Sequence, residues 1–172
     1  ILMILFVTLT NQNVKTRMYD HTLDQISNSG KIHIFSEEHE NFYIASIKMF
    51  SDYPFFGIGP KMYRVVCEDE RYYYKSKNTN LHTCSTSPHG IYPQLLAETG
   101  AIGTTFVFGF FIYIIFLFTK HICLKFRSIS FLNDYQICLL VSLFISLWPI
   151  IPAGNFFGSW ISIIYYLPLG FL

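Results

Sequence analysis

The stretch TGAIGTTFVFGFFIYIIFLFT, residues 99–119, contains no charged side chain. A helix needs about 20 mainly apolar residues to cross a bilayer, and this run is long enough. Its glycines and threonines would weaken a water-exposed helix, but both residue types are common in membrane helices. The alternative, a buried helix of a large soluble protein, fits the length of the run less well. Residues 99–119 therefore predict a transmembrane helix.

The composition of the whole chain agrees with a membrane location. Of its 172 residues, 52% are hydrophobic, 19% are aromatic and 13% are charged, whereas soluble domains carry about 25% charged residues. So many aromatic residues exclude a disordered chain, which needs low hydrophobicity. The net charge of +1 argues against nucleic-acid binding, which requires a basic excess. We expect membrane lipids, and no nucleic acid, as partners.

Shorter apolar stretches lie on both sides of this run. Residues 135–152 predict a second transmembrane helix and residues 161–172 the start of a third, with a turn over residues 153–160. Residues 1–10 are too few to cross a bilayer and predict the end of an earlier transmembrane helix. We therefore expect an all-α membrane protein, and we interpret the chain as the C-terminal portion of a larger multi-pass protein.

The distribution of charge predicts the orientation of these helices. The loop over residues 120–134 has a basic excess, made up of Lys120, Lys125 and Arg127 against Asp134. Short basic loops stay on the cytoplasmic side of the membrane. Residues 11–98 and the 153–160 turn are then expected on the opposite side. The nine basic and ten acidic residues of the long segment give no opposing bias.

The long segment, residues 11–98, has a helix signal followed by a turn signal. Ser36 suits the N-cap of a helix, and apolar residues such as Phe42, Ala45 and Met49 recur at helical spacing until Pro54 would end the helix. We expect this stripe to pack against membrane helices. The glycines of PFFGIGP, residues 54–60, predict a tight turn, and a Gly-x-Gly pair alone is weak support for phosphate binding.

Two cysteines, Cys67 and Cys84, fall in the same segment. If the segment faces an oxidising compartment, the two are expected to form a disulfide. The bond would close a loop of 18 residues and stabilise the fold by about 3 kcal/mol on the chain-entropy estimate. The alternative is a pair of free thiols.

His89 lies just before a helix start signalled by Pro93, which suits the first helical turn. A helix N-terminus presents unpaired N–H groups and attracts phosphates, and a histidine can transfer protons near neutral pH. His89 is therefore a candidate for phosphate contact or proton transfer, although a loop histidine is more commonly only solvated. One histidine and the nearby Glu98 are too few ligands for a metal site, so no metal is expected.

Three stretches together resemble the C-terminal half of bacterial O-antigen ligase and polymerase family proteins. They are IKMFSDYPFFGIGPKMYR (47–64), CSTSPHGIYPQLLAETGAIG (84–103) and WPIIPAGNFFGSWISIIYYLPLGF (148–171), of which the second is the most specific. The resemblance implies a GT-C-type polytopic helical bundle in the bacterial inner membrane. A large, partly helical periplasmic loop would hold the active site, in agreement with the orientation predicted from charge.

The same resemblance implies the reaction. A glycan would pass from a polyprenyl-pyrophosphate donor to a lipid A–core or glycan acceptor, with inversion and without a metal or other cofactor. His89 matches the catalytic-loop histidine of the family and is assigned to activating the acceptor or contacting pyrophosphate. Arg64 matches the arginine after the glycine turn, and Arg17 matches a second pyrophosphate ligand more loosely. For both arginines the alternative is an anchor at the membrane interface.

The comparison with the family pattern gives two further candidate site residues and two departures from the pattern. Glu98 is a candidate site residue that could equally cap or anchor the helix, and His39 stands where many relatives carry arginine. Relatives often show HPHN where this chain has Ser-Pro-His-Gly at residues 87–90.

Two other functions fit the same features. A non-catalytic polytopic membrane protein, such as a flippase subunit or a scaffold for lipid-linked glycans, would need the helices and arginines but not His89. An inactive fragment is the remaining alternative.

Overall fold

The computed structural model describes residues 11–20, 37–72, 74–75, 80–81 and 84–172. The chain divides into two compact units, Ile1–Asn41 and Phe42–Leu172. In the first, helix α2 (Gln12–Lys15) begins at Asn11, whose side chain accepts hydrogen bonds from the N–H groups of Asn13 and Val14. A π-helical turn, η1 (Thr16–Asp20), follows directly. The predicted helix end over residues 1–10 and the Ser36 cap lie outside the described residues.

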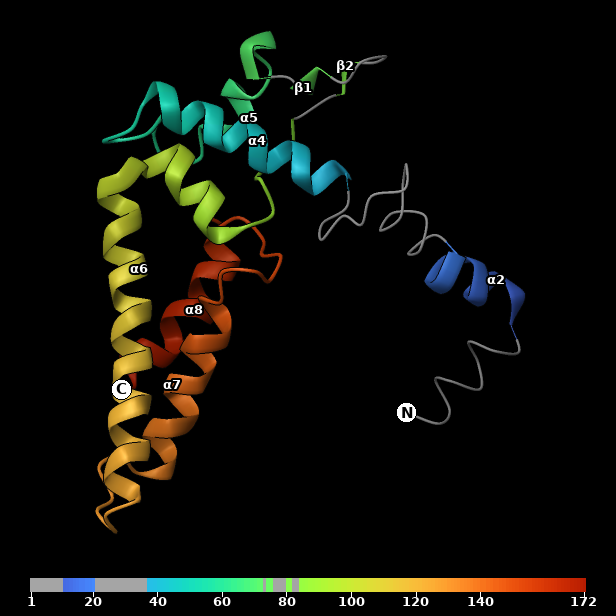
Figure 1. Cartoon of the computed structure of the whole chain (residues 1–172). Helices are drawn as coiled ribbons and strands as arrows, with labels where there is room; N and C mark the ends of the chain where they lie inside the picture. Colours follow the sequence, from blue (N-terminus) through green and yellow to red (C-terminus); the bar gives the residue numbers. More distant parts are fainter. Residues whose placement is uncertain (1–10, 21–36, 73, 76–79, 82–83) are drawn as a thin grey trace. The chain divides into compact units, whose positions relative to one another are not determined.

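The second unit is helical (Figure 1). Its longer helices are α4 (Glu37–Asp52), which starts in the first unit, α6 (Ile91–Lys125), α7 (Asp134–Ser146) and α8 (Ser159–Gly170). Two short helices, α5 (Tyr63–Val66) and η3 (Glu70–Tyr72), follow α4. Within the described ranges, extended structure is confined to the antiparallel pair β1 (Tyr74–Lys75) and β2 (Asn80–Leu81).

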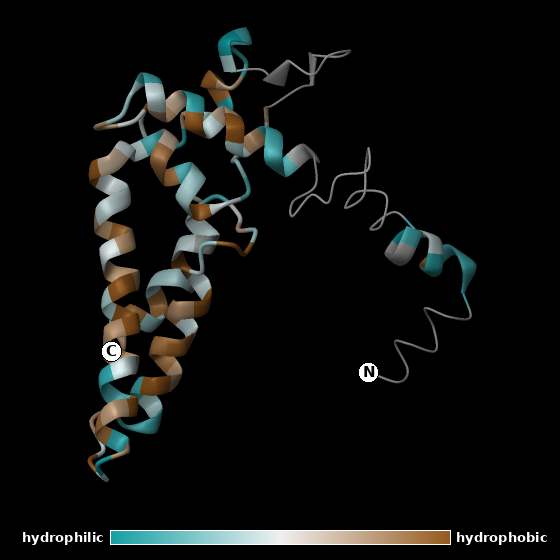
Figure 2. Cartoon of the chain, in the orientation of Figure 1, coloured by the Kyte–Doolittle hydropathy of each residue, from teal (hydrophilic) through white to brown (hydrophobic). Residues whose placement is uncertain are grey.

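Helix α6 is long and apolar enough to cross a membrane. Its residues 101–125 rise about 37 Å, which exceeds the thickness of about 30 Å of a bilayer's hydrocarbon core. Only 11% of its most apolar window is buried in the described fold, unlike the core helix of a soluble protein, and Phe106 remains 76% exposed. Figure 2 shows apolar residues over the length of α6 and the neighbouring α7. By length and composition, α6 is a candidate membrane helix.

A sharp kink divides α6 at Gly100, whose backbone angles are φ 65° and ψ −164°. A segment of the glycine turn that follows α4 inserts at this point and takes over the helical hydrogen bonds. Four backbone bonds of 2.8–3.3 Å join the two segments: Ile58 N–H to Ala97 O, Gly59 N–H to Glu98 O, Ala101 N–H to Pro54 O, and Ile102 N–H to Phe55 O. In an unbroken helix, the N–H groups of residues 101 and 102 would bond residues 97 and 98 instead.

Both glycines at this junction are required by space as well as by backbone angle. Gly57 has φ +66°, and a Cβ there would lie 2.6 Å from the carbonyl oxygen of Ala97. A Cβ on Gly100 would overlap the backbone of Phe55. The tight turn predicted for residues 54–60 is therefore present, and its function in the fold is to fit against the kinked helix.

Helices α6, α7 and α8 share one apolar core. Its buried members are Ile91, Leu95, Phe111, Ile114, Leu140, Leu143, Leu147 and Phe156. Phe111 and Phe144 stack with ring centroids 5.5 Å apart, which holds α6 against α7. The loop before α7 is fixed by a capping box between Asn133 and Gln136 and by the N–H of Leu132, which donates to His121 Nδ1 at 3.1 Å.

Helix α7 is shorter than the helix predicted over residues 135–152, because it ends at Ser146. Pro149 and Pro152 explain the difference, since proline lacks the N–H group that an α-helix needs and disfavours helical angles in the preceding residue. The 13 residues of α7 rise only about 20 Å. Helix α8 begins at Ser159, two residues before the predicted start.

The stripe of α4 packs differently from the prediction. Ala45 and Met49 are fully buried, but their neighbours in the second core are Tyr63, Cys67, Tyr72 and Ala97. All four belong to the long segment itself, residues 11–98, and Ala97 precedes the kink of α6. Helix α4 ends at Asp52, in agreement with the stop signal at Pro54. The stripe therefore builds the core that carries the candidate site.

Candidate functional site

His89 occupies a strained position immediately before helix α6. Its φ is 56°, in the left-handed region that few non-glycine residues adopt. Its carbonyl oxygen accepts a hydrogen bond of 2.9 Å from the N–H of Ala153, in the loop between α7 and α8. The half-buried imidazole lies 3.1 Å from Ser85 Oγ through Nε2 and 5.6 Å from the ring of Phe42. These contacts from three segments fix both the backbone and the ring.

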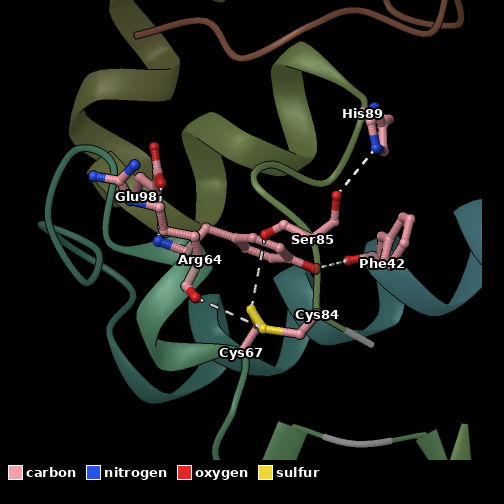
Figure 3. The surroundings of a disulfide bond; sticks show 8 residues. Phe42, Arg64, Cys67, Cys84, Ser85, His89 and Glu98 are labelled. Carbon is pink, nitrogen blue, oxygen red and sulfur yellow. Dashed lines mark hydrogen bonds between the residues drawn. A yellow bond between two sulfur atoms is a disulfide. The ribbon is translucent and has the colours of Figure 1, made fainter. Parts of the chain in front are cut away.

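A disulfide joins Cys67 and Cys84, with their Cα atoms 5.0 Å apart. Cys67 caps the C-terminal end of α5, and Cys84 directly precedes Ser85, the residue that bonds His89 (Figure 3). The bridge therefore ties the His89 loop to α5. Of the two alternatives for these cysteines, the structure contains the disulfide.

Glu98 is fully buried and links α6 to α5. Its Oε1 accepts a hydrogen bond of 2.9 Å from the N–H of Tyr63, the first residue of α5. Its Oε2 accepts one of 2.9 Å from Gln94 Nε2. Neutral donors thus satisfy both oxygens, so the carboxylate serves as an internal cap for α5. This role differs from the one considered from the sequence, in which Glu98 would cap or anchor its own helix α6. The enclosed side chain has no surface for a substrate.

Gln94 and Asn155 form the second link of the site, which the sequence did not reveal. Gln94 is buried, and its Nε2 donates to Asn155 Oδ1 at 2.8 Å while its Oε1 accepts from the N–H of Phe156 at 2.8 Å. Asn155 Nδ2 in turn donates to the carbonyl oxygen of Thr86 at 3.4 Å. The loop between α7 and α8 therefore holds the His89 loop at two points, residues 86 and 89. The sequence signal that could have indicated this link is Asn155, the one amide side chain in the apolar stretch WPIIPAGNFF, residues 148–157.

Arg64 is the second residue of α5 and is exposed. Within the described part of the chain, no carboxylate or other acceptor bonds its guanidinium. Arg71 provides the contrast on the same segment, because its Nε and Nη2 donate to Asp69 at 2.9 and 2.7 Å. These bonds lower the pKa of the Asp69 carboxyl. Arg64 is thus the uncommitted cation of the two.

Tyr63 and Phe42 connect Arg64 to His89. The hydroxyl of Tyr63 donates to the carbonyl oxygen of Phe42 at 3.4 Å, and the Phe42 ring packs on the imidazole of His89. Burial raises the pKa of Tyr63 above its ordinary value, so the hydroxyl remains a donor at physiological pH. No bond joins the side chains of Arg64 and His89 directly, and Figure 3 shows them apart, with Arg64 on the left and His89 on the right.

The two remaining predicted site residues lie on other elements. Arg17 is exposed in η1 of the first unit. His39 is half-buried in the first turn of α4. Among the residues that the structure describes, no three or more His, Cys, Asp or Glu side chains gather in a group that could hold a metal ion.

The site can bind an anion at Arg64 and move a proton at His89. An imidazole near neutral pH accepts a proton in its neutral form and donates one when charged. Arg64 presents the planar fork of donors that suits phosphate oxygens. Comparison with family models, with curated proteins and with solved structures found no match to this chain.

Proposed function

We propose that this chain carries the catalytic loop and adjoining membrane helices of a glycosyltransferase of the O-antigen ligase or polymerase type. The enzyme transfers a glycan from a polyprenyl-pyrophosphate donor to a lipid A–core or glycan acceptor. The reaction takes place at the periplasmic face of the bacterial inner membrane, in a multi-pass GT-C-type helical bundle. It inverts the configuration of the sugar and uses no metal.

The observation that carries this proposal is the constraint on His89. A left-handed backbone costs of order 1–3 kcal/mol in a non-glycine residue and persists only when its surroundings enforce it. Ala153, Ser85 and Phe42 supply that enforcement from three different segments. A merely solvated loop histidine needs no such support. The fixed imidazole is instead what positioning of a reacting group requires.

In the proposed reaction His89 acts as general base. It takes the proton from the acceptor hydroxyl as the hydroxyl oxygen bonds to the anomeric carbon of the donor sugar. The bond from that carbon to the pyrophosphate oxygen breaks, and both of its electrons leave with the pyrophosphate. General base assistance of this kind contributes typically 10²–10⁴-fold to the rate.

Arg64 is proposed to hold the donor's pyrophosphate. Its guanidinium is exposed, and no acceptor within the described residues occupies it, so the guanidinium is available for a bidentate contact. Positive charge at this position stabilises the negative charge that develops on the leaving group. Arg17 is proposed as a second phosphate ligand. The proposed donor lies in the membrane, where the long apolar helix α6 and the basic 120–134 loop support the placement of this site at the opposite face.

The test compares His89→Ala with Thr86→Ala in the full-length protein. Thr86 is exposed on the same loop, and only its backbone carbonyl enters the described network. His89→Ala should lower the rate of glycan transfer from the lipid-linked donor by about 10²-fold or more, while Thr86→Ala retains it. Unchanged transfer by His89→Ala at equal expression would exclude His89 as the general base. Absence of transfer by the wild-type protein would instead favour a non-catalytic scaffold for lipid-linked glycans.

A further inference from the structure

The glycine turn exposes two large aromatic side chains next to the kink of α6. Phe55 is 67% exposed and Phe56 is 77% exposed. Both lie in the uncharged stretch YPFFGIGP, residues 53–60. Exposed apolar groups of this size require an explanation when they gather on a tight turn, because a single turn offers them little cover.

The backbone bonds of the turn fix the height of these residues along α6. Phe55 O accepts a hydrogen bond of 3.3 Å from the N–H of Ile102, and Pro54 O accepts one of 2.8 Å from Ala101. The close fit of Gly100 against the Phe55 backbone leaves no room for the turn to shift. Phe55 and Phe56 are therefore held level with the first residues of the charge-free run 99–119.

The surface of α6 at and beyond this level is also apolar. Ile102 is 42% exposed and Phe106, one turn further along, is 76% exposed. The nearest charged side chains along the chain, Asp52 and Lys61, flank the turn on either side and are exposed. Tyr53, at the start of the turn, is 48% exposed and combines a ring with a hydroxyl, as residues at membrane interfaces commonly do.

We propose that Phe55 and Phe56 insert into the interfacial layer of the lipid bilayer and anchor the catalytic loop to the membrane surface. This inference rests on the membrane placement of α6 in the proposed function. The occupant is lipid because the turn continues the exposed apolar surface of the one described helix able to cross a membrane. The backbone bonds from Ile58 to Ala97 and from Gly59 to Glu98 connect the turn to α6. Because Glu98 caps α5, the helix that bears Arg64 is held at a fixed distance from the membrane surface as well.

The insertion can be measured with spin labels in the full-length protein reconstituted into phosphatidylethanolamine and phosphatidylglycerol vesicles. Cys123 and Cys138 are free and are replaced by serine, while the Cys67–Cys84 disulfide is kept. Single cysteines are then introduced by Phe56→Cys, by Phe106→Cys as the control within the bilayer, and by Ser51→Cys as the aqueous control on α4. Accessibility is compared between oxygen, which partitions into lipid, and a water-soluble nickel complex.

The proposal expects labels at positions 56 and 106 to favour oxygen severalfold over nickel and the label at 51 to favour nickel. If position 106 favours oxygen while position 56 resembles position 51, the turn does not insert although α6 spans the membrane. A label at 56 that neither reagent reaches would show a protein cover and would also overturn the proposal. If position 106 itself is aqueous, the membrane placement fails, and the proposed function fails with it. Phe55→Cys serves as a second variant should Phe56→Cys not fold.

Discussion

Gln94 Nε2 lies 2.8 Å from Asn155 Oδ1 and joins two segments that are 61 residues apart in sequence. The same nitrogen also donates to Glu98, so one buried amide connects the loop between α7 and α8 to the cap of α5. Both hydrogens of the amide nitrogen and its oxygen are used. Gln94 is therefore the central residue of the buried hydrogen-bond network that supports the His89 loop.

Replacing Gln94 by leucine should destabilise the fold strongly. The substitution leaves Glu98 Oε2 and the N–H of Phe156 without a partner, and each unsatisfied buried group costs about 1–3 kcal/mol. We expect a loss of about 3 kcal/mol, measured by thermal or denaturant unfolding of the purified protein. Thr105→Val, on an exposed position of the same helix, should remain within about 0.5 kcal/mol of wild type. Equal stability of the two variants would contradict the network.

The glycine turn makes a second prediction, because Gly57 and Gly109 differ in their surroundings and in their backbone angles. Gly57→Ala places a methyl group against the backbone at Ala97 and Glu98 at a positive φ, and should cost at least about 2 kcal/mol. A Cβ on Gly109 meets nothing within 4 Å, so Gly109→Ala should be neutral or stabilising by up to about 1 kcal/mol. The free energy of unfolding is measured for both variants. A Gly57→Ala variant as stable as the wild type would contradict the close fit of the turn against α6.

Loss of the disulfide should affect both stability and transfer. The sequence separation of 17 residues between Cys67 and Cys84 corresponds to a stabilisation of about 3 kcal/mol on the chain-entropy estimate. Cys67→Ser with Cys84→Ser should therefore lower the unfolding free energy by about that amount and reduce transfer, because Ser85 and His89 lose their tie to α5. Cys138→Ser removes a free thiol and should change neither. Full transfer by the double variant would separate the disulfide from the site.

Arg64→Lys should impair transfer more than the retained charge suggests. Lysine keeps the positive charge but loses the planar fork of donors, so we expect kcat/KM to fall by about tenfold, or about 1.4 kcal/mol. Arg71→Lys is the matched control, since Arg71 is already paired with Asp69 at the surface and surface pairs contribute little. The outcome against a pyrophosphate contact is equal kcat/KM for Arg64→Lys and the wild type.

Tyr72 gives a prediction at alkaline pH. Burial, together with the hydrogen bond of 2.8 Å to Asp52, raises the pKa of Tyr72 from 10.0 to about 12. Because the pKa of Tyr72 is higher in the folded than in the unfolded protein, its protonated hydroxyl stabilises the fold fully below about pH 10. This contribution to the free energy of unfolding is lost as the pH rises towards 12. The difference in tyrosinate absorbance between wild type and Tyr72→Phe should titrate near pH 12, and a midpoint near pH 10 would show that the hydroxyl is not held.

Local signals in the sequence predicted the parts of the fold that depend on neighbouring residues. The uncharged run 99–119 lies within α6, Pro54 follows the end of α4, and Pro93 lies in the first turn of α6. The end of α7 was missed, although Pro149 and Pro152 carry the reason, because hydrophobicity alone extended the predicted helix through them. Hydrophobic composition reports whether a segment favours the membrane, whereas proline determines whether its backbone can continue as a helix.

The kink and the buried network could not be predicted, because their partners are distant in sequence. No local pattern indicates that Gly100 would open the helix to admit residues 54–59. Likewise, Asn155 acquires its role only when the loop between α7 and α8 folds back onto Gln94. The position of His89 was predicted, but the left-handed backbone that fixes its ring depends on the N–H of Ala153.

The exchanged hydrogen bonds at Gly100 also have a mechanical consequence. Because the turn and α6 complete each other's backbone bonding, α6 cannot tilt or rotate while the turn stays still without breaking several bonds at once. A change of bilayer thickness that tilts the helix therefore moves the turn, and with it the segment that bears Arg64. For the proposed membrane enzyme, glycan transfer is therefore expected to depend on the thickness of the bilayer around α6.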